Sequence, residues 1–232
     1  MQATLVKKEH LADDIQSFWF RPSQRIRYDA GQFIGLTLPQ TDRLNNDQRW
    51  FTLSSSPSEE LIAITTKIHE KSSPYKQALV NLKPGDNVTI SQPMGDFVLP
   101  KDSTIPLVFV AIGVGITPVR SILTWLKHTR ERRTIQVVYA ARKQSDLVFL
   151  DTLTSAASNL TLVLSQPHKK WSGYSGKLDA TKLSELSDNR PNTVFFISGP
   201  EEITKDLTHN LQRNGVEKYR IVADHFPGYH TE

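Results

Sequence analysis

The chain contains 232 residues and no cysteine, which excludes disulfides, thiolate metal sites, iron–sulfur clusters and thiol nucleophiles, so any redox chemistry must belong to a bound organic cofactor. Its 38% hydrophobic and 22% charged residues are typical of a globular protein with one large or two small domains, and no apolar run is long enough to span a bilayer. The net charge of +4 suits an acidic partner. The basic residues lack the interleaved aromatics of a nucleic-acid platform, so we expect no nucleic-acid binding. Because no apolar run is long enough, we also expect no membrane insertion.

The first half of the chain has the pattern of a small β domain. Its first ten residues hold two lysines and a glutamate without a following apolar block, so we expect no signal peptide and a cytoplasmic protein. Short apolar runs, separated by turn residues, then lie at residues 19–20, 32–38, 50–53, 61–68 and 87–90. They favour an antiparallel barrel or sandwich, with one short helix that begins at Ser73 or Pro74 and ends at Leu82.

The strand that begins at Arg49 carries the first candidate ligand site. Its sequence, RWFTLS over residues 49–54, combines an arginine, two aromatics and two hydroxyls. Alternation along a strand gives two faces, one with Arg49, Phe51 and Leu53 and the other with Trp50, Thr52 and Ser54. An arginine offers a planar fork to a phosphate, and hydroxyls bond the ring heteroatoms of a flat ligand. An edge strand with a surface arginine explains the segment equally well.

After Pro100 the pattern changes to strands that alternate with longer helices. The expected strands are 107–112, 135–140, 160–164, 194–198 and 220–223, and the expected helices are 119–129, 147–156, 180–186 and 201–214. Such alternation predicts right-handed βαβ units and a parallel sheet. We therefore expect two domains, residues 1–101 and 102–232.

The turn between the strand at 107–112 and the next helix is the second candidate site. Gly113 and Gly115 permit a tight turn close to a ligand, while Thr117 can cap the helix and Pro118 suits its first turn. The helix amino end then attracts an anion such as the pyrophosphate of a nicotinamide dinucleotide. Because Pro118 stands where the usual motif has its third glycine, an ordinary strand-to-helix turn is an equal alternative.

Two further patterns bear on the ligand. Arg142, with Lys143, follows the second parallel strand, where an arginine accommodates a ribose 2′-phosphate, so this position favours NADPH over NADH. A solvated surface arginine is the alternative. The seven histidines show no metal-binding spacing, and no nucleophile elbow is present.

Several motifs, taken in order, resemble the ferredoxin-NADP reductase superfamily. Residues 49–52 resemble its Arg-x-Tyr/Phe-Ser/Thr flavin signature, and the remaining matches are Gly95-Asp96-Phe97, the turn from Gly113 to Pro118, Ser198-Gly199-Pro200 and the stretch from Asp224 to Tyr229. The resemblance covers essentially the whole chain. It implies an antiparallel Greek-key FAD-binding barrel followed by a parallel-sheet α/β domain that binds NADP, with NAD as a possible alternative.

The resemblance assigns the barrel residues to FAD. Arg49 would contact the pyrophosphate, Phe51 would lie against the isoalloxazine ring, and Thr52 would place its hydroxyl near N5, the atom that accepts hydride. The same segment adds Trp50, Leu53 and Ser54. Further contacts are expected at the start of the short helix and on the strand before it, from Ser72, Ser73, Thr66 and Lys67. A plain helix cap explains Ser73 as well.

In the second half, the resemblance assigns the glycine turns to the nicotinamide nucleotide. One wall would be Gly113, Gly115, Thr117 and Pro118, and the opposite wall Ser198, Gly199 and Pro200. Many relatives have cysteine where Ser198 stands. Asp224 and Phe226 resemble the family's carboxylate and terminal aromatic. Relatives often have Glu and Tyr at these two positions. Because the Asp224 side chain is shorter than that of Glu, it does not favour a proton relay. The expected catalytic residues are Thr52, Ser198, Asp224 and Phe226.

The activity that follows is hydride transfer from NADPH or NADH to FAD and onward electron transfer to an external carrier such as ferredoxin or flavodoxin. Two alternatives stay open. One is a reductase of free flavin or another small oxidant. The other is a non-enzymatic flavoprotein subunit that relays electrons inside a larger complex.

Overall fold

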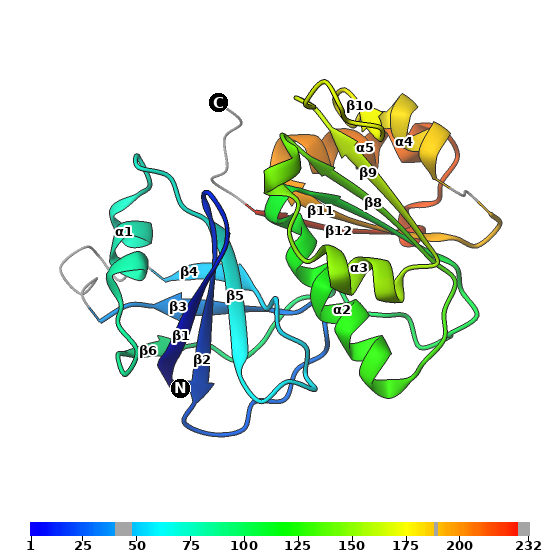
Figure 1. The fold of residues 1–232 in the computed structure, drawn as a ribbon. Coiled ribbons are helices and arrows are strands. Elements are labelled where there is room, and N and C mark those ends of the chain that lie inside the picture. Colours follow the sequence, from blue (N-terminus) through cyan, green and yellow to red (C-terminus); the bar gives the residue numbers. More distant parts are fainter. Residues whose placement is uncertain (40–47, 188–189, 227–232) are drawn as a thin grey trace.

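The computed structural model describes residues 1–39, 48–187 and 190–226, with side chains of the last strand described as far as Asp224. It contains two six-stranded sheets that follow each other along the chain. Figure 1 shows them as two lobes side by side, with helix α2 (Ile116–Thr129) at their junction. No helix within the described part of the chain combines the length and the apolar character that a membrane crossing requires.

The amino-terminal lobe is an antiparallel barrel. Its strands are β1 (Gln2–Ala12), β2 (Ile15–Pro22), β3 (Phe33–Thr37), β4 (Arg49–Thr52), β5 (Ile62–Lys67) and β6 (Asn87–Ile90), in the order β4-β3-β6-β1-β2-β5. The outer strands β4 and β5 meet at a bridge between Leu53 and Ile64, which closes the sheet. Alternate side chains such as Phe18 and Phe20 point inward and are fully buried. Helix α1 (Pro74–Asn81) packs onto this core.

The carboxy-terminal lobe is a parallel sheet covered by helices on both faces. Its strands are β7 (Leu107–Ile112), β8 (Ile135–Ala141), β9 (Asn159–Leu164), β10 (Tyr174–Ser175), β11 (Val194–Pro200) and β12 (Ile221–Phe226), in the order β10-β9-β8-β7-β11-β12. Helices α2 and α3 (Leu150–Ala156) bury their apolar residues on one face, and α4 (Ala180–Leu186) and α5 (Glu201–Arg213) bury theirs on the other. The predicted combination of a β-barrel and a parallel α/β sheet is confirmed.

The order of the parallel strands reverses between β7 and β11. From β7 the chain runs outward through β8 and β9 to β10, then returns to β11 and β12 on the other side of β7. In open parallel sheets, ligands bind beyond the carboxyl ends of the strands at such a reversal. Gly113 directly follows β7 and Gly199 lies near the end of β11, so both glycine turns are at this place.

The two lobes are packed against each other. Phe97 follows the barrel strands, yet its ring contacts Phe196 of β11, with centroids 5.0 Å apart and planes at 77°. Arg133 holds the connecting segment, because its guanidinium donates to the carbonyls of Pro100 (2.8 Å) and Asp102 (3.0 Å). The predicted domain boundary between residues 101 and 102 falls in this segment, and the domain limits stay a prediction.

The third helix of the sequence prediction begins later than expected. A helix was predicted over 147–156, but α3 begins at Leu150, after Phe149, whose φ of 63° is left-handed. Leu147 and Val148 are instead buried in the core, and the Val148 amide donates to the Tyr139 hydroxyl at 3.4 Å. Burial raises the pKa of that hydroxyl. The last strand is longer than the predicted 220–223, because β12 pairs with β11 along its whole length.

Candidate functional site

The two glycine turns of the α/β lobe lie against each other. Residues Gly113–Gly115 form a short 3-10 turn that leads into α2. A Cβ on Gly115 would lie 2.1 Å from the Ser198 carbonyl oxygen, and one on Gly199 would lie 2.8 Å from the Ile112 Cβ. Only glycine permits both approaches. Gly113 differs, because it has a φ of +56° and an added Cβ would meet nothing within 4 Å.

Thr117 does not cap the helix, contrary to the sequence prediction. Helix α2 begins at Ile116, so Thr117 and Pro118 already lie in its first turn and both are buried. The Thr117 hydroxyl donates to the Val114 carbonyl at 3.0 Å. The 3-10 turn before α2 supplies the helix start without a side-chain cap, because its last residue, Gly115, leads directly into the helix.

A hydrogen bond joins the predicted flavin strand to the last strand of the chain. The Thr52 hydroxyl at the end of β4 donates to Asp224 Oδ2 of β12 at 3.2 Å, and Thr52 is 3% exposed. Asp224 is the register partner of Ser198 on the neighbouring strand β11. Three of the four predicted catalytic residues are therefore together, one from the barrel and two from the α/β lobe. Phe226 pairs with Pro200 in the same ladder, and its side chain lies outside the described atoms.

Ser198 presents a buried hydroxyl to this place. The residue is fully buried, and its Oγ has no hydrogen-bond partner among the described residues. Leaving a buried hydroxyl unpaired costs about 1–3 kcal/mol, a cost that a polar group of a ligand removes. The sequence prediction named this residue, although its lack of a protein partner was visible only in the structure.

The strand alternation predicted around Arg49 is seen in the ring contacts. The Arg49 guanidinium lies 5.9 Å from the Tyr75 ring centroid, and the Phe51 ring stacks on the same Tyr75 at 6.1 Å and 25°. Trp50 faces the other way, edge-on to Phe33 at 5.6 Å, and is 48% exposed. Arg49 is exposed, whereas Phe51 and the rest of the segment, Leu53 and Ser54 included, are buried.

In the second group of predicted flavin contacts, Ser72 and Ser73 bond nearby backbone amides, and Lys67 pairs with two carboxylates. Ser73 caps α1, because its Oγ accepts from the Lys76 amide at 3.4 Å, and Ser72 Oγ accepts from the His69 amide at 2.7 Å. Thr66 is buried. The Lys67 ammonium lies 3.0 Å from Asp14 Oδ2 in the β1–β2 turn and 4.0 Å from Asp146 Oδ2 in the α/β lobe, so its charge already links the two lobes.

Arg142 and Lys143 have different surroundings at the end of β8. Arg142 is exposed, and its Nε donates to Gln166 Oε1 at 2.9 Å. The Lys143 ammonium is paired with Asp13 Oδ2 of the barrel at 2.9 Å. This contact lowers the pKa of Asp13 and raises that of Lys143. Of the two basic side chains, only Arg142 keeps its cation away from a carboxylate in the contacts described.

The sequence prediction missed one contact beside the site. Arg120 and Ser121 of α2 bind the carbonyls of Ser54 and Ser55, just after β4. The signal was a single charged residue, Arg120, in the otherwise uncharged sequence ITPVRSIL at the start of α2. No local rule identified its partner, Glu59, which lies in the other lobe.

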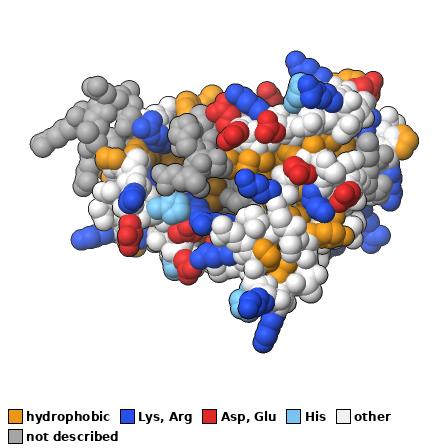
Figure 2. Space-filling model, turned by 90° about the horizontal axis from the view of Figure 1, so that it is seen from above, with side chains coloured by type: hydrophobic (Ala, Val, Ile, Leu, Met, Phe, Trp, Pro, Cys, Tyr) orange, Lys and Arg blue, Asp and Glu red, His pale blue; other side chains and the backbone are white. Residues whose placement is uncertain are grey.

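The face of the molecule that Figure 2 shows carries both signs of charge. Seen from above, Lys and Arg side chains are interspersed with Asp and Glu over the visible face (Figure 2). A surface of mixed sign gives weak long-range steering, so short-range contacts must select a partner.

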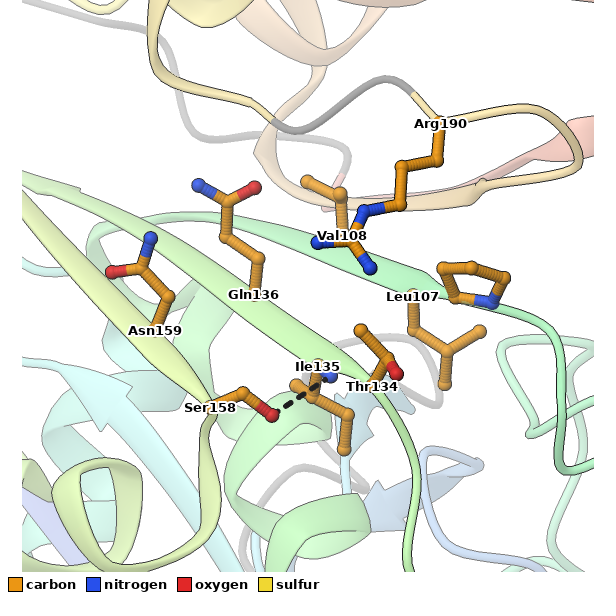
Figure 3. Close-up of a pocket in the computed structure, with 9 residues that line it drawn as sticks. Leu107, Val108, Thr134, Ile135, Gln136, Ser158, Asn159 and Arg190 are labelled. Carbon is orange, nitrogen blue, oxygen red and sulfur yellow. Dashed lines mark hydrogen bonds between the residues drawn. The ribbon is translucent and has the colours of Figure 1, made fainter.

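Two cavities lie elsewhere. One of about 210 Å³ lies among the amino ends of β7, β8 and β9 (Figure 3), where Arg190 reaches down from the loop before β11 and Ser158 Oγ accepts from the Ile135 amide at 3.3 Å. The other, of about 450 Å³, lies beside the first residues of β11 and β12 and Tyr219. Both are at the opposite end of the strands from Gly113, so neither belongs to this site.

Comparisons with known proteins match both lobes. A model of the oxidoreductase FAD-binding domain matches residues 2–99, and a model of the oxidoreductase NAD-binding domain matches residues 109–209. The chain is 27% identical over 231 residues to the stachydrine N-demethylase reductase subunit Stc4 of Rhizobium meliloti, covering 94% of this chain and 65% of that protein. It is 33% identical over 159 residues to a subunit of the Na⁺-translocating NADH-quinone reductase of Yersinia enterocolitica, covering 64% of this chain and 39% of that protein.

The fold also matches solved structures. A ferredoxin NADP⁺ reductase from Neisseria gonorrhoeae with bound FAD and NADP superimposes with a TM-score of 0.84 at 19% identity, over 97% of this chain and 98% of that one. The structural likeness therefore extends over both lobes and their arrangement.

Proposed function

This chain belongs to the ferredoxin-NADP reductase superfamily of FAD- and NAD-binding oxidoreductases, and on that premise we propose that it passes electrons from NADPH or NADH to an external carrier such as ferredoxin or flavodoxin. The observation that carries the proposal is the hydrogen bond between Thr52 and Asp224. It brings the end of the predicted flavin strand to the strand next to Ser198, where the predicted nicotinamide turns lie.

The residues present fit both cofactors. An exposed arginine on β4 supplies a planar cation for a pyrophosphate. The buried hydroxyl of Ser198, which has no partner among the described residues, supplies a polar contact for a carboxamide. A Cβ added at Gly113 would meet nothing within 4 Å, so the turn that precedes α2 has room beside its backbone for the second pyrophosphate. FAD, when bound, supplies a ring that takes up a hydride and releases electrons singly or in pairs.

The protein's own part is to align groups and to exclude water. The Thr52 hydroxyl donates its hydrogen bond to Asp224, so the Thr52 oxygen can only accept a further hydrogen bond, from an N–H group of a ligand. A buried Thr52 also excludes water from that contact, since its side chain is almost inaccessible.

NADPH is the nucleotide that the proposal favours. Arg142 stands at the carboxyl end of β8, where a cation accommodates a ribose 2′-phosphate. Its Nε bonds Gln166, a neutral side chain, and its guanidinium is paired with no carboxylate among the described residues. Lys143 contributes less, because Asp13 neutralises its ammonium.

A second candidate is a reductase subunit of a larger assembly. Two relatives are named as subunits, and the chain spans 65% of the length of one and 39% of the length of the other.

Turnover of the isolated chain, with reduction of the carrier as the readout, separates a carrier reductase from a reductase of free flavin. Steady oxidation of NADPH or NADH by the isolated chain with an artificial dye rejects a pure relay. A cytoplasmic location stays a prediction from the sequence.

The direct test is spectroscopic. We expect the purified protein to be yellow with bound FAD and to bleach when NADPH or NADH is added without oxygen. A colourless protein that cannot be reconstituted with FAD would contradict the proposal.

A further inference from the structure

We propose that Arg120, assisted by Ser121, is a positioning residue that fixes the distance between the Thr52 segment and the Gly113–Gly115 turn. The inference rests on the proposed function, because that distance matters when one cofactor is held by each lobe. Neither residue belongs to the predicted ligand contacts. Both act on the backbone that carries those contacts.

The guanidinium of Arg120 binds both a backbone carbonyl and a side-chain carboxylate of the barrel. Its Nη1 donates to the Ser54 carbonyl at 2.8 Å, and its two terminal nitrogens form a fork with the Glu59 carboxylate, with Nη2 2.9 Å from Oε1. Glu59 Oε2 in turn accepts from the Ser56 amide at 2.7 Å. The side chains of Arg120 and Glu59 are only 13% and 25% exposed. The turn from Ser54 to Glu59 is thus held as one unit against α2.

Ser121 repeats the contact one residue further on. Its hydroxyl donates to the Ser55 carbonyl at 2.5 Å, and both residues are fully buried. Two adjacent carbonyls of the barrel are therefore held by two adjacent residues of the helix. Ser54 lies two positions after Thr52, and Arg120 lies five positions after Gly115, about 7.5 Å along the helix axis. These short, rigid connections transmit any shift of α2 directly to Thr52.

Arg120 is unsuited to bind a phosphate itself. Its charge is matched by Glu59, and its guanidinium lies 5.6 Å from the ring centroids of both Trp19 and Phe149. Trp19 belongs to the barrel and Phe149 to the α/β lobe, so the guanidinium lies near one aromatic ring from each domain. A lysine cannot replace this arrangement, because its ammonium lacks the planar fork and the stacking surface.

Removing the fork loosens the junction and leaves the barrel side intact. Ser54 still donates its amide to the Ala63 carbonyl at 2.8 Å, and the Ser55 hydroxyl still accepts from the Ala63 amide at 2.8 Å. The flavin strand therefore keeps its own sheet contacts. A misplacement of about 1 Å between reacting groups lowers a rate about 100-fold, whereas binding of each cofactor to its own lobe does not depend on the junction.

The test uses Arg120→Met and Arg120→Lys in the FAD-loaded protein, with Arg21→Met as the matched control. Arg21 pairs with Glu60, next to Glu59, at 2.5 Å, but both side chains of that pair are exposed and the pair lies within the barrel. We expect Arg120→Met to lower kcat per bound FAD about 10- to 100-fold, while KM for the nucleotide stays within twofold of wild type. Arg120→Lys should have an intermediate kcat. The Arg21→Met control should match wild type.

Amide hydrogen exchange supplies a readout that is independent of turnover. Arg120→Met should speed exchange at least tenfold in residues 54–59 and leave β7 unchanged. If Arg120→Met folds poorly, Ser121→Ala removes a single bond to the same segment and should show the same effects at a smaller size.

Unchanged kcat and unchanged exchange in an FAD-loaded variant would overturn the positioning role and leave the proposed function standing. A loss of activity that only follows loss of bound FAD would overturn it as well. A wild-type protein that binds no FAD would refute the proposed function, and the exchange measurement would then decide alone whether Arg120 holds the segment.

Discussion

Replacement of Thr52 by valine removes the hydroxyl that reaches from β4 to β12 and keeps the shape of the side chain. Hydrogen bonds to a charged group contribute about 1.5–3 kcal/mol, but 3.2 Å is long for an O–H···O bond and Asp224 is partly exposed. We therefore expect a loss of about 1 kcal/mol, a factor of about five in an equilibrium or a rate constant.

A double-mutant cycle isolates that contact. The variants are Thr52→Val, Asp224→Ala and the pair, each loaded with FAD and unfolded in urea, with Thr52→Ser as the control that keeps the hydroxyl. The coupling between the two positions should be about 1 kcal/mol, and Thr52→Ser should resemble wild type. Strictly additive single effects would show that the two residues do not interact, and the link between the lobes at this site would be refuted.

Three further predictions concern the rest of the site. Arg142→Ala should raise KM for NADPH at least tenfold more than KM for NADH, and equal effects would remove Arg142 from nucleotide selection. Gly115→Ala should destabilise the protein by about 3 kcal/mol, because its Cβ would lie 2.1 Å from a backbone oxygen of β11, and thermal unfolding with a Tm within about 2 °C of wild type would contradict this. The hydrogen bond and charge of Lys143 lower the pKa of Asp13 in the folded protein. The pair therefore stabilises the fold fully at pH values above the pKa that Asp13 has in the unfolded chain. This stabilisation is lost as the pH falls through the lower pKa of the folded protein. Lys143→Ala should therefore lower the urea midpoint at pH 7 in low salt and leave it unchanged at pH 2, and an equal shift at both pH values would exclude the pair as its cause.

Most of the fold could be predicted from local patterns in the sequence. The periodicity of the second half identified β7, β8 and α4 closely, since buried parallel strands and amphipathic helices leave strong signals. The sequence placed the start of α3 too early. Phe149 has a left-handed backbone, and the two residues before it are buried in the core instead of lying in the helix. Helix propensity alone gives no sign of that constraint.

The site was predictable only in part. Gly115, Ser198 and Asp224 were identified by their motifs, but their contact depends on strand order, which a single sequence does not encode locally. The pairing of Arg120 with Glu59 joins two lobes across a long sequence separation. Sequence spacing identifies side chains on one element, and contacts between elements require the fold.

A crystal structure of the FAD-loaded protein with a bound nicotinamide nucleotide would show whether the two cofactors meet. We expect the flavin ring beside Thr52 and the nicotinamide ring against the surface where the Gly113–Gly115 turn meets Ser198, with the two rings in contact. Rings bound in separate places, with no path of contact between them, would contradict it.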